Sequence, residues 1–187
     1  MVLARLCGAT PAADAFFVAY RIPNLLRELF AEGSMSAAFI PVFTEYHTLK
    51  TKREAWELAS ATFTTLLTIV TAVTLLGILA APGIVWLLAP GFRGSPDKLA
   101  LTTLLTQMMF PYLIFISLAA LAMGILNSLR AFAAPAFSPV FFNIFTIACM
   151  MFLSPWLPEP IIGVAIGIVV GGVAQFAMQL PGLQGRG

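Results

Sequence analysis

Four long stretches of this sequence carry no charged side chain. They are residues 58–92, 99–129, 131–158 and 160–185. Each is longer than the roughly 20 residues that a helix needs to cross a bilayer. Because lipid offers no partner for backbone amides, a membrane-crossing segment must be a helix or part of a closed barrel, whose strands alternate apolar and polar residues. The sequence shows no such alternation, so it predicts an all-α, polytopic membrane fold.

The composition agrees with lipid as the main solvent of this chain. Hydrophobic residues make up 60% of its 187 residues and charged residues only 10%, against roughly 25% in soluble domains. So little polar surface cannot cover a soluble core of this size. The few lysines and arginines are not clustered as in nucleic-acid-binding proteins, which excludes that class of partner. Twelve of the eighteen charged side chains (10 basic and 8 acidic) lie at or before Glu57.

The uncharged stretches and the turn residues between them predict the helical segments. These are a remnant of a first span at residues 1–7, a long kinked helix at 12–49, and complete spans at 58–80, 99–129, 135–153 and 161–180. The kinked helix would cross the membrane as a fifth complete span, with interruptions at Pro23, Gly33 and Pro41. An Ala-Pro-Gly run at 81–83 would end the span at 58–80, and Pro111 would kink the span at 99–129.

Basic residues in the short loops predict the orientation of these spans. One side of the membrane holds Lys50, Lys52, Arg53, Arg130 and Arg186, and the other holds Arg93 and Lys98. Lysine and arginine are enriched in cytoplasmic loops, so the side with five basic residues is predicted to be cytoplasmic. The charged elbow at residues 50–57 would then face the cytoplasm, and the loop at residues 93–98 would face the opposite side.

The kinked helix is the polar element of the sequence. It carries Asp14, Arg21, Arg27, Glu28, Glu32 and Glu45. Ionisable groups in a membrane cost at least about 2.5 kcal/mol each unless they face protein or water. At roughly 100° per residue, Asp14, Arg21, Glu28 and Glu32 share one face, whereas Arg27 projects elsewhere. One hypothesis is a water-filled cavity whose arginines hold an anionic head group. The alternative is that arginines and carboxylates neutralise one another structurally.

Two further motifs have a functional and a structural interpretation. Pro23 removes a backbone hydrogen bond beside Asn24, and discontinuous helices line substrate sites in transporters, although a packing kink explains the pair equally well. Gly163, Gly167 and Gly171 form a stripe at four-residue spacing, which allows close approach of another helix. That helix would belong to the same bundle or, as the alternative, to a second copy in a homodimer.

The sequence contains no recognisable catalytic or metal-binding motif. It has a single histidine, and Cys7 and Cys149 lie far apart among apolar residues without metal-ligand spacing. Nucleophile-elbow, zinc-protease and phosphate-loop patterns are all missing. We therefore predict that the chain is not an enzyme and binds neither a metal nor a cofactor.

The segment GATPAADAFFVAYRIPNLLRELFAEGSMSAAFIPVFTEY, at residues 8–46, resembles the second-helix signature of the MurJ (MviN) family. This family comprises bacterial lipid II flippases of the MOP exporter superfamily. Further similarities are LAPGF at 88–92, FPYLIFISLAALAMGILNS at 110–128, FAAPAFSP at 132–139 and QLPGL at 179–183. The resemblance therefore covers essentially the whole chain.

The resemblance implies a two-lobed transporter of about fourteen helices, of which this chain would form the first lobe, from part-way along its first helix. The second lobe of the same protein would complete the binding cleft. Lipid II, an undecaprenyl-pyrophosphate-linked sugar peptide, would cross the inner membrane by alternating access for peptidoglycan biosynthesis and cell shape. Another exporter of the superfamily, for O-antigen or drugs, is one alternative, and a membrane scaffold without transport activity is the other.

The resemblance also assigns roles to individual residues. Arg27 matches a cavity arginine of the family, and Asp14 matches the acidic residue at the start of its second helix. Glu32 matches an acid near the cytoplasmic gate, while Arg21 is a weaker match to a basic position. With Pro23 and Asn24, these residues are the expected substrate-binding and gating positions.

Overall fold

The computed structural model describes residues 10–185, apart from the side chains of residues 31–37. Within that range the chain is helical and has no strand, which confirms the predicted all-α fold. The elements are α2 (Pro11–Arg27), a π-helical turn (Glu28–Gly33), α3 (Ser34–Leu49), α4 (Lys52–Leu88), α5 (Pro96–Met109), α6 (Tyr112–Ser128), α7 (Ala133–Phe152), α8 (Pro160–Ala177) and α9 (Leu180–Gln184), with 3₁₀ turns at Pro90–Phe92 and Ser154–Trp156. The first-span remnant predicted at residues 1–7, including Cys7, lies outside the described residues.

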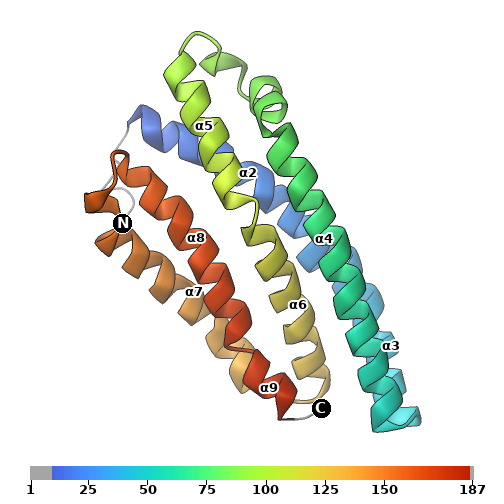
Figure 1. The fold of residues 1–187 in the computed structure, drawn as a ribbon. Helices are drawn as coiled ribbons and strands as arrows, with labels where there is room; N and C mark the ends of the chain where they lie inside the picture. The colour runs from blue at the N-terminus through green and yellow to red at the C-terminus, as the bar shows by residue number, and fades with distance from the viewer. Residues whose placement is uncertain (1–9, 186–187) are drawn as a thin grey trace.

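The helices form an elongated bundle around the α5–α6 segment (Figure 1). In this view α4 lies on one side of that segment and the α7–α8 pair on the other, while α2 crosses behind α5 towards the middle of α4, and α3 lies behind the lower part of α4. Buried residues of α2, α5 and α8 form one core cluster, and those of α3, α4 and α6 form another. The α5–α6 segment is therefore the central element of the bundle.

Four segments of the described chain are long and apolar enough to cross a membrane. They are Lys52–Leu88, Pro96–Ser128, Ala133–Trp156 and Pro160–Gln184. They correspond to the four uncharged stretches of the sequence. The polar segment at residues 11–49 is not among them, so its crossing of the membrane stays a prediction.

The predicted end of the third span at residues 81–83 is wrong, because helix α4 includes these residues. The helix continues through Pro82 to Leu88. Proline has no N–H, so Pro82 leaves the carbonyl of Ile78 without its usual helical partner. The side-chain amide of Gln107, on α5, donates a hydrogen bond to that carbonyl at 3.1 Å. A neighbouring helix thus compensates for the proline, and the span remains continuous.

Gln107→Leu is expected to destabilise the bundle, because it leaves the Ile78 carbonyl unsatisfied in an apolar setting. Such a loss costs about 1–3 kcal/mol and should lower the melting temperature in detergent by several degrees. The control is Asn143→Leu, since Asn143 is exposed on α7 and donates to the carbonyl of Pro139 within its own helix. Equal melting temperatures for the two variants would show that Gln107 does not support α4.

Candidate functional site

Helix α2 begins at a well-defined cap and packs with its small side chains inward. The hydroxyl of Thr10 accepts a hydrogen bond from the backbone N–H of Ala13, and Pro11 occupies the first turn. Ala13, Ala15, Phe16 and Ala19 are buried in the cluster shared with α5 and α8. These contacts decide which face of α2 remains uncovered.

The uncovered face of α2 carries most of its charges. Four residues of α2, together with the residue that follows the helix, are exposed, and we call this set the α2 face: Asp14, Phe17, Arg21, Leu25 and Glu28. The predicted alignment of Asp14, Arg21 and Glu28 is therefore present in the structure. The side chain of Glu32, the fourth residue predicted to share this face, lies outside the described residues. Charges on an open face of a membrane bundle require water or additional protein in front of them.

Arg27 lies apart from the α2 face, as its helical position predicts. Its side chain is half-buried, and its Nε atom is buried. Arg27 is also the last residue of α2, directly before the π-helical turn at Glu28–Gly33. Short π-helical turns occur frequently at functional sites. The side chain that the family resemblance assigns to the substrate thus lies at the point where the helix changes its geometry.

Of the interruptions predicted at Pro23, Gly33 and Pro41, only the one at Gly33 coincides with a break in the regular α-helix. Pro23 is buried inside α2, which continues through it to Arg27. The regular helix is instead interrupted by the π-helical turn that begins at Glu28. Asn24 is half-buried, and its side-chain amide donates a hydrogen bond to a carboxylate oxygen of Glu28 at 3.2 Å. Asn24 therefore lies next to the α2 face and holds the carboxylate of Glu28 by a hydrogen bond.

Asp14 has a partner that the sequence analysis missed. The ammonium group of Lys98 lies 2.8 Å from a carboxylate oxygen of Asp14, although the two residues are 84 positions apart. The same ammonium group lies 4.2 Å from the centre of the Phe92 ring. In the sequence Lys98 is only a loop charge, because no local pattern relates residues so distant from one another.

The glycine stripe of α8 faces α7. A Cβ atom built on Gly167 would lie 2.9 Å from the carbonyl oxygen of Thr146, and one built on Gly171 would lie 2.8 Å from the carbonyl oxygen of Phe142. A Cβ atom on Gly163 would clash in the same way with Ser154. The hydroxyl of Thr146 also donates to the carbonyl of Gly167 at 3.1 Å. The chain itself covers the stripe, which leaves no room there for a second copy.

The described residues offer no site for a metal ion. No group of three or more histidine, cysteine, aspartate or glutamate side chains comes together in that part of the chain. The ring of His47 stacks on that of Phe43, with ring centres 6.2 Å apart. The charged groups of α2 therefore remain the chemically distinctive feature of the structure.

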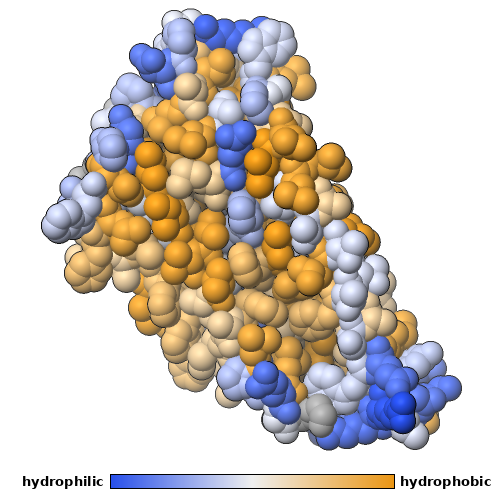
Figure 2. All heavy atoms as spheres, viewed as in Figure 1, coloured by the Kyte–Doolittle hydropathy of each residue, from blue (hydrophilic) through white to orange (hydrophobic). Residues whose placement is uncertain are grey.

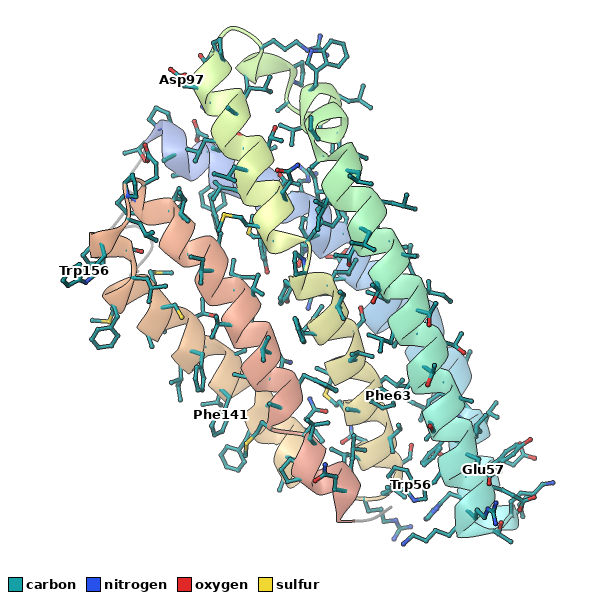
Figure 3. The ribbon with its side chains drawn as sticks, viewed as in Figure 1. Trp56, Glu57, Phe63, Asp97, Phe141 and Trp156 are labelled. Atoms are coloured by element: carbon teal, nitrogen blue, oxygen red, sulfur yellow. The ribbon has the colours of Figure 1, made fainter. Side chains whose placement is uncertain are left out.

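The two polar regions of the chain lie at opposite ends of the bundle. Figure 3 shows Asp97 at one end, which we call the loop end, and Trp56 with Glu57 at the other, the elbow end. In Figure 2, hydrophilic residues gather at the top and at the lower right, with a mostly hydrophobic surface between them. This separation matches the two water-facing sides predicted from the basic loops.

Cysteine labelling is expected to place the elbow in the cytoplasm. Thr51 and Ser95 are both exposed, one at the elbow end and one at the loop end. In intact cells, a membrane-impermeant thiol reagent should modify Ser95→Cys but reach Thr51→Cys only after the cells are opened, because basic loops stay cytoplasmic. Modification of Thr51→Cys in intact cells would invert the topology.

Comparison with known proteins gives one consistent result. The family model described as "Lipid II flippase MurJ" matches residues 3–187. A probable lipid II flippase MurJ of Vibrio cholerae is 45% identical over 188 residues, and the lipid II flippase MurJ of Burkholderia cenocepacia is 41% identical over 183 residues. These alignments include 97% and 98% of this chain but only 36% of each relative. The chain thus spans about a third of the length of these relatives.

The solved structures include one with the same arrangement of helices. A lipid II flippase MurJ in an inward closed conformation superposes with a TM-score of 0.76 at 29% sequence identity. The match includes 96% of this chain and 37% of that structure. The fold and the sequence therefore give the same family assignment.

Proposed function

This chain belongs to the lipid II flippase MurJ family, and on that premise we propose that it takes part in moving lipid II across the bacterial inner membrane. It would act as one lobe of a two-lobed transporter that opens alternately to the two sides, and not as an enzyme. The relatives named as lipid II flippases support the choice of substrate. The single structural observation that carries the proposal is the α2 face, where the polar helix leaves its charges uncovered.

The chemistry of the substrate explains why a polar helix is useful here. The pyrophosphate of lipid II is an anion, and an unpaired ion in hydrocarbon carries a prohibitive desolvation cost. An arginine guanidinium presents a planar fork of donors that matches phosphate oxygens and stays charged when buried. We propose that Arg27 and Arg21 pair with the pyrophosphate, and that Glu32, Asn24 and Pro23 belong to the gate and cavity wall on the cytoplasmic side.

The position of Arg27 is suited to this role. Arg27 lies 16 residues after the start of α2, which corresponds to roughly 24 Å along a helix and so to a position well past the first half of a hydrocarbon core about 30 Å thick. Its half-buried side chain would hold the pyrophosphate away from lipid tails. Arg21, exposed and about two turns nearer the loop end, would offer the next cationic position along the path.

The scaffold alternative is less well supported by the arrangement of charges. Structural ion pairs stabilise a bundle when they lie between its helices, and Asp14–Lys98 is such a pair. Arg21 and Glu28, in contrast, are exposed on the outside of the described bundle. Exposed charges in the membrane-crossing part of a helix require a polar environment, which a water-filled substrate path would supply.

The proposal is tested by transport in vesicles containing a full-length protein with this chain. Fluorescent lipid II should move between leaflets faster than in protein-free vesicles, whereas a lipid with the same undecaprenyl chain and a neutral head group should not. A lipid-linked O-antigen unit and a cationic dye test the other exporters of the superfamily. Transport of the dye or the O-antigen unit without lipid II would refute the proposed substrate.

A further inference from the structure

A cavity of about 770 Å³ opens at the loop end, where α2, α5 and α8 begin. Its lining includes the charged residues Asp97, Lys98 and Glu159 together with the first residues of α2 and α8. Lys98 crosses from α5 to α2 at the edge of this cavity. Its ammonium group contacts the Asp14 carboxylate at 2.8 Å and lies 4.2 Å from the centre of the Phe92 ring.

The placement of Lys98 is unusual for a lysine near a membrane surface. Its side chain is only 20% exposed, whereas that of Asp14 is 65% exposed. Lys98 is also the third residue of α5, and a cation close to the positive end of a helix is electrostatically unfavourable. Asp97 and Glu159 line the same cavity and offer alternative anionic partners. Lys98 nevertheless points to Asp14 on α2. This contact between helices offsets the electrostatic cost of a cation at the start of α5.

The buried side of α2 near Asp14 packs mainly through small side chains. Ala13, Ala15 and Ala19 lie in the core beside Phe16, which is also buried. Asp14 and Arg21 lie seven residues apart, within about 20° of one another around the helix. A contact that fixes the direction of Asp14 therefore also fixes the direction of Arg21.

We infer that Lys98 is a positioning residue for the proposed transport function, on which this inference rests. Through Asp14, and held by the Phe92 ring, Lys98 sets the rotation of α2 that presents Arg21 to the substrate path. Asp14 then acts through the position of α2, and its carboxylate does not bind the substrate. Lys98, at the start of α5, thus controls the direction of Arg21, which lies deeper in the membrane.

Charge exchange in a full-length protein tests the inference. Lys98→Met and Asp14→Asn should each slow lipid II transport roughly tenfold, the size expected for a coupled charge pair. Lys98→Arg and the exchange Asp14→Lys with Lys98→Asp should restore most of the rate. Lys52→Met, an exposed lysine at the elbow end, is the control and should transport normally.

A second readout reports the rotation of α2 and does not depend on transport. In a cysteine-free background, Phe17→Cys on the α2 face should react with a water-soluble thiol reagent much faster than Phe16→Cys, which replaces a buried residue. Lys98→Met should reduce this ratio at least threefold, and the charge exchange should restore it.

The two readouts separate failure of the inference from failure of the proposed function. An unchanged labelling ratio in Lys98→Met would overturn the positioning role. A restored ratio without restored transport in the charge exchange would also overturn the inference, because the Asp14 carboxylate would then be needed at the substrate. A wild-type protein that transports no lipid II would refute the proposed function alone, since the labelling ratio still decides whether Lys98 orients α2.

Discussion

Replacing Arg27 by alanine in a full-length protein that contains this chain is expected to abolish growth of a flippase-depleted bacterium that depends on it. Expression in the membrane should remain near normal. Arg27→Lys should restore growth only in part, because lysine offers a point charge that burial can neutralise, whereas a guanidinium offers two parallel donors and stays charged. Colony counts after depletion, together with immunoblots of membranes, measure both effects.

Two further variants separate substrate binding from charge balance. If Arg27 only neutralised a carboxylate of its own helix, its removal would leave that group unpaired, and folding would suffer before transport did. Full growth of the double variant Arg27→Ala with Glu28→Gln would therefore contradict a substrate role for Arg27. Arg53→Ala is the control for loss of an arginine, because Arg53 is 88% exposed and pairs with Glu57 at the elbow end.

Gly167→Leu is expected to cause a large loss of stability in the bundle. A Cβ atom at this position would lie 2.9 Å from the carbonyl oxygen of Thr146 and 3.2 Å from the Cβ atom of Cys149. A leucine would therefore force α7 and α8 apart and break the hydrogen bond from the Thr146 hydroxyl to the Gly167 carbonyl. Overpacking of this kind costs about 1–3 kcal/mol or more, and the melting temperature in detergent should fall by roughly 5 °C or more.

The chain provides a matched control for this substitution. Gly83 lies inside α4, and a Cβ atom built on it meets no atom within 4 Å. Gly83→Leu introduces the same side chain into a helix without a steric conflict, so the melting temperature should stay within about 2 °C of the wild-type value. Similar losses in both variants would indicate that close packing of α7 and α8 does not depend on the glycine stripe.

The features of the fold that depend on local sequence could be predicted. Long uncharged stretches must be helical in lipid, and the structure places helices α4 to α9 over them. Helical periodicity also predicts the common face of Asp14, Arg21 and Glu28, because neighbours along one helix keep their angular relation wherever the helix packs. Four-residue spacing of glycines likewise identifies a contact face before the partner helix is known.

The features that depend on distant neighbours could not be predicted. By residue type Pro82 should end a helix, but Gln107, 29 residues away from Ile78, supplies the hydrogen bond that replaces the missing one. The sequence around Asp14 shows no partner for its carboxylate, and only the fold places Lys98 beside it. The start of the π-helical turn, directly after Arg27, has no sequence signal, although Gly33 at its end marks a predicted interruption. The interruption predicted at Pro23 is absent, because α2 continues through this proline. Each of these features is decided by packing and not by residue type.

The most direct test of the account is whether the α2 face meets water or lipid tails. In a cysteine-free protein, Phe17→Cys on α2 can be compared with Phe137→Cys and Ile144→Cys on α7, because these side chains are similarly exposed, at 60%, 59% and 54%. A charged thiol reagent attacks only thiolates in water. The account predicts rapid modification of Phe17→Cys, slowed by lipid II, and little modification on α7. Equal, slow modification at all three positions would show that lipid covers the α2 face and would contradict a substrate path along it.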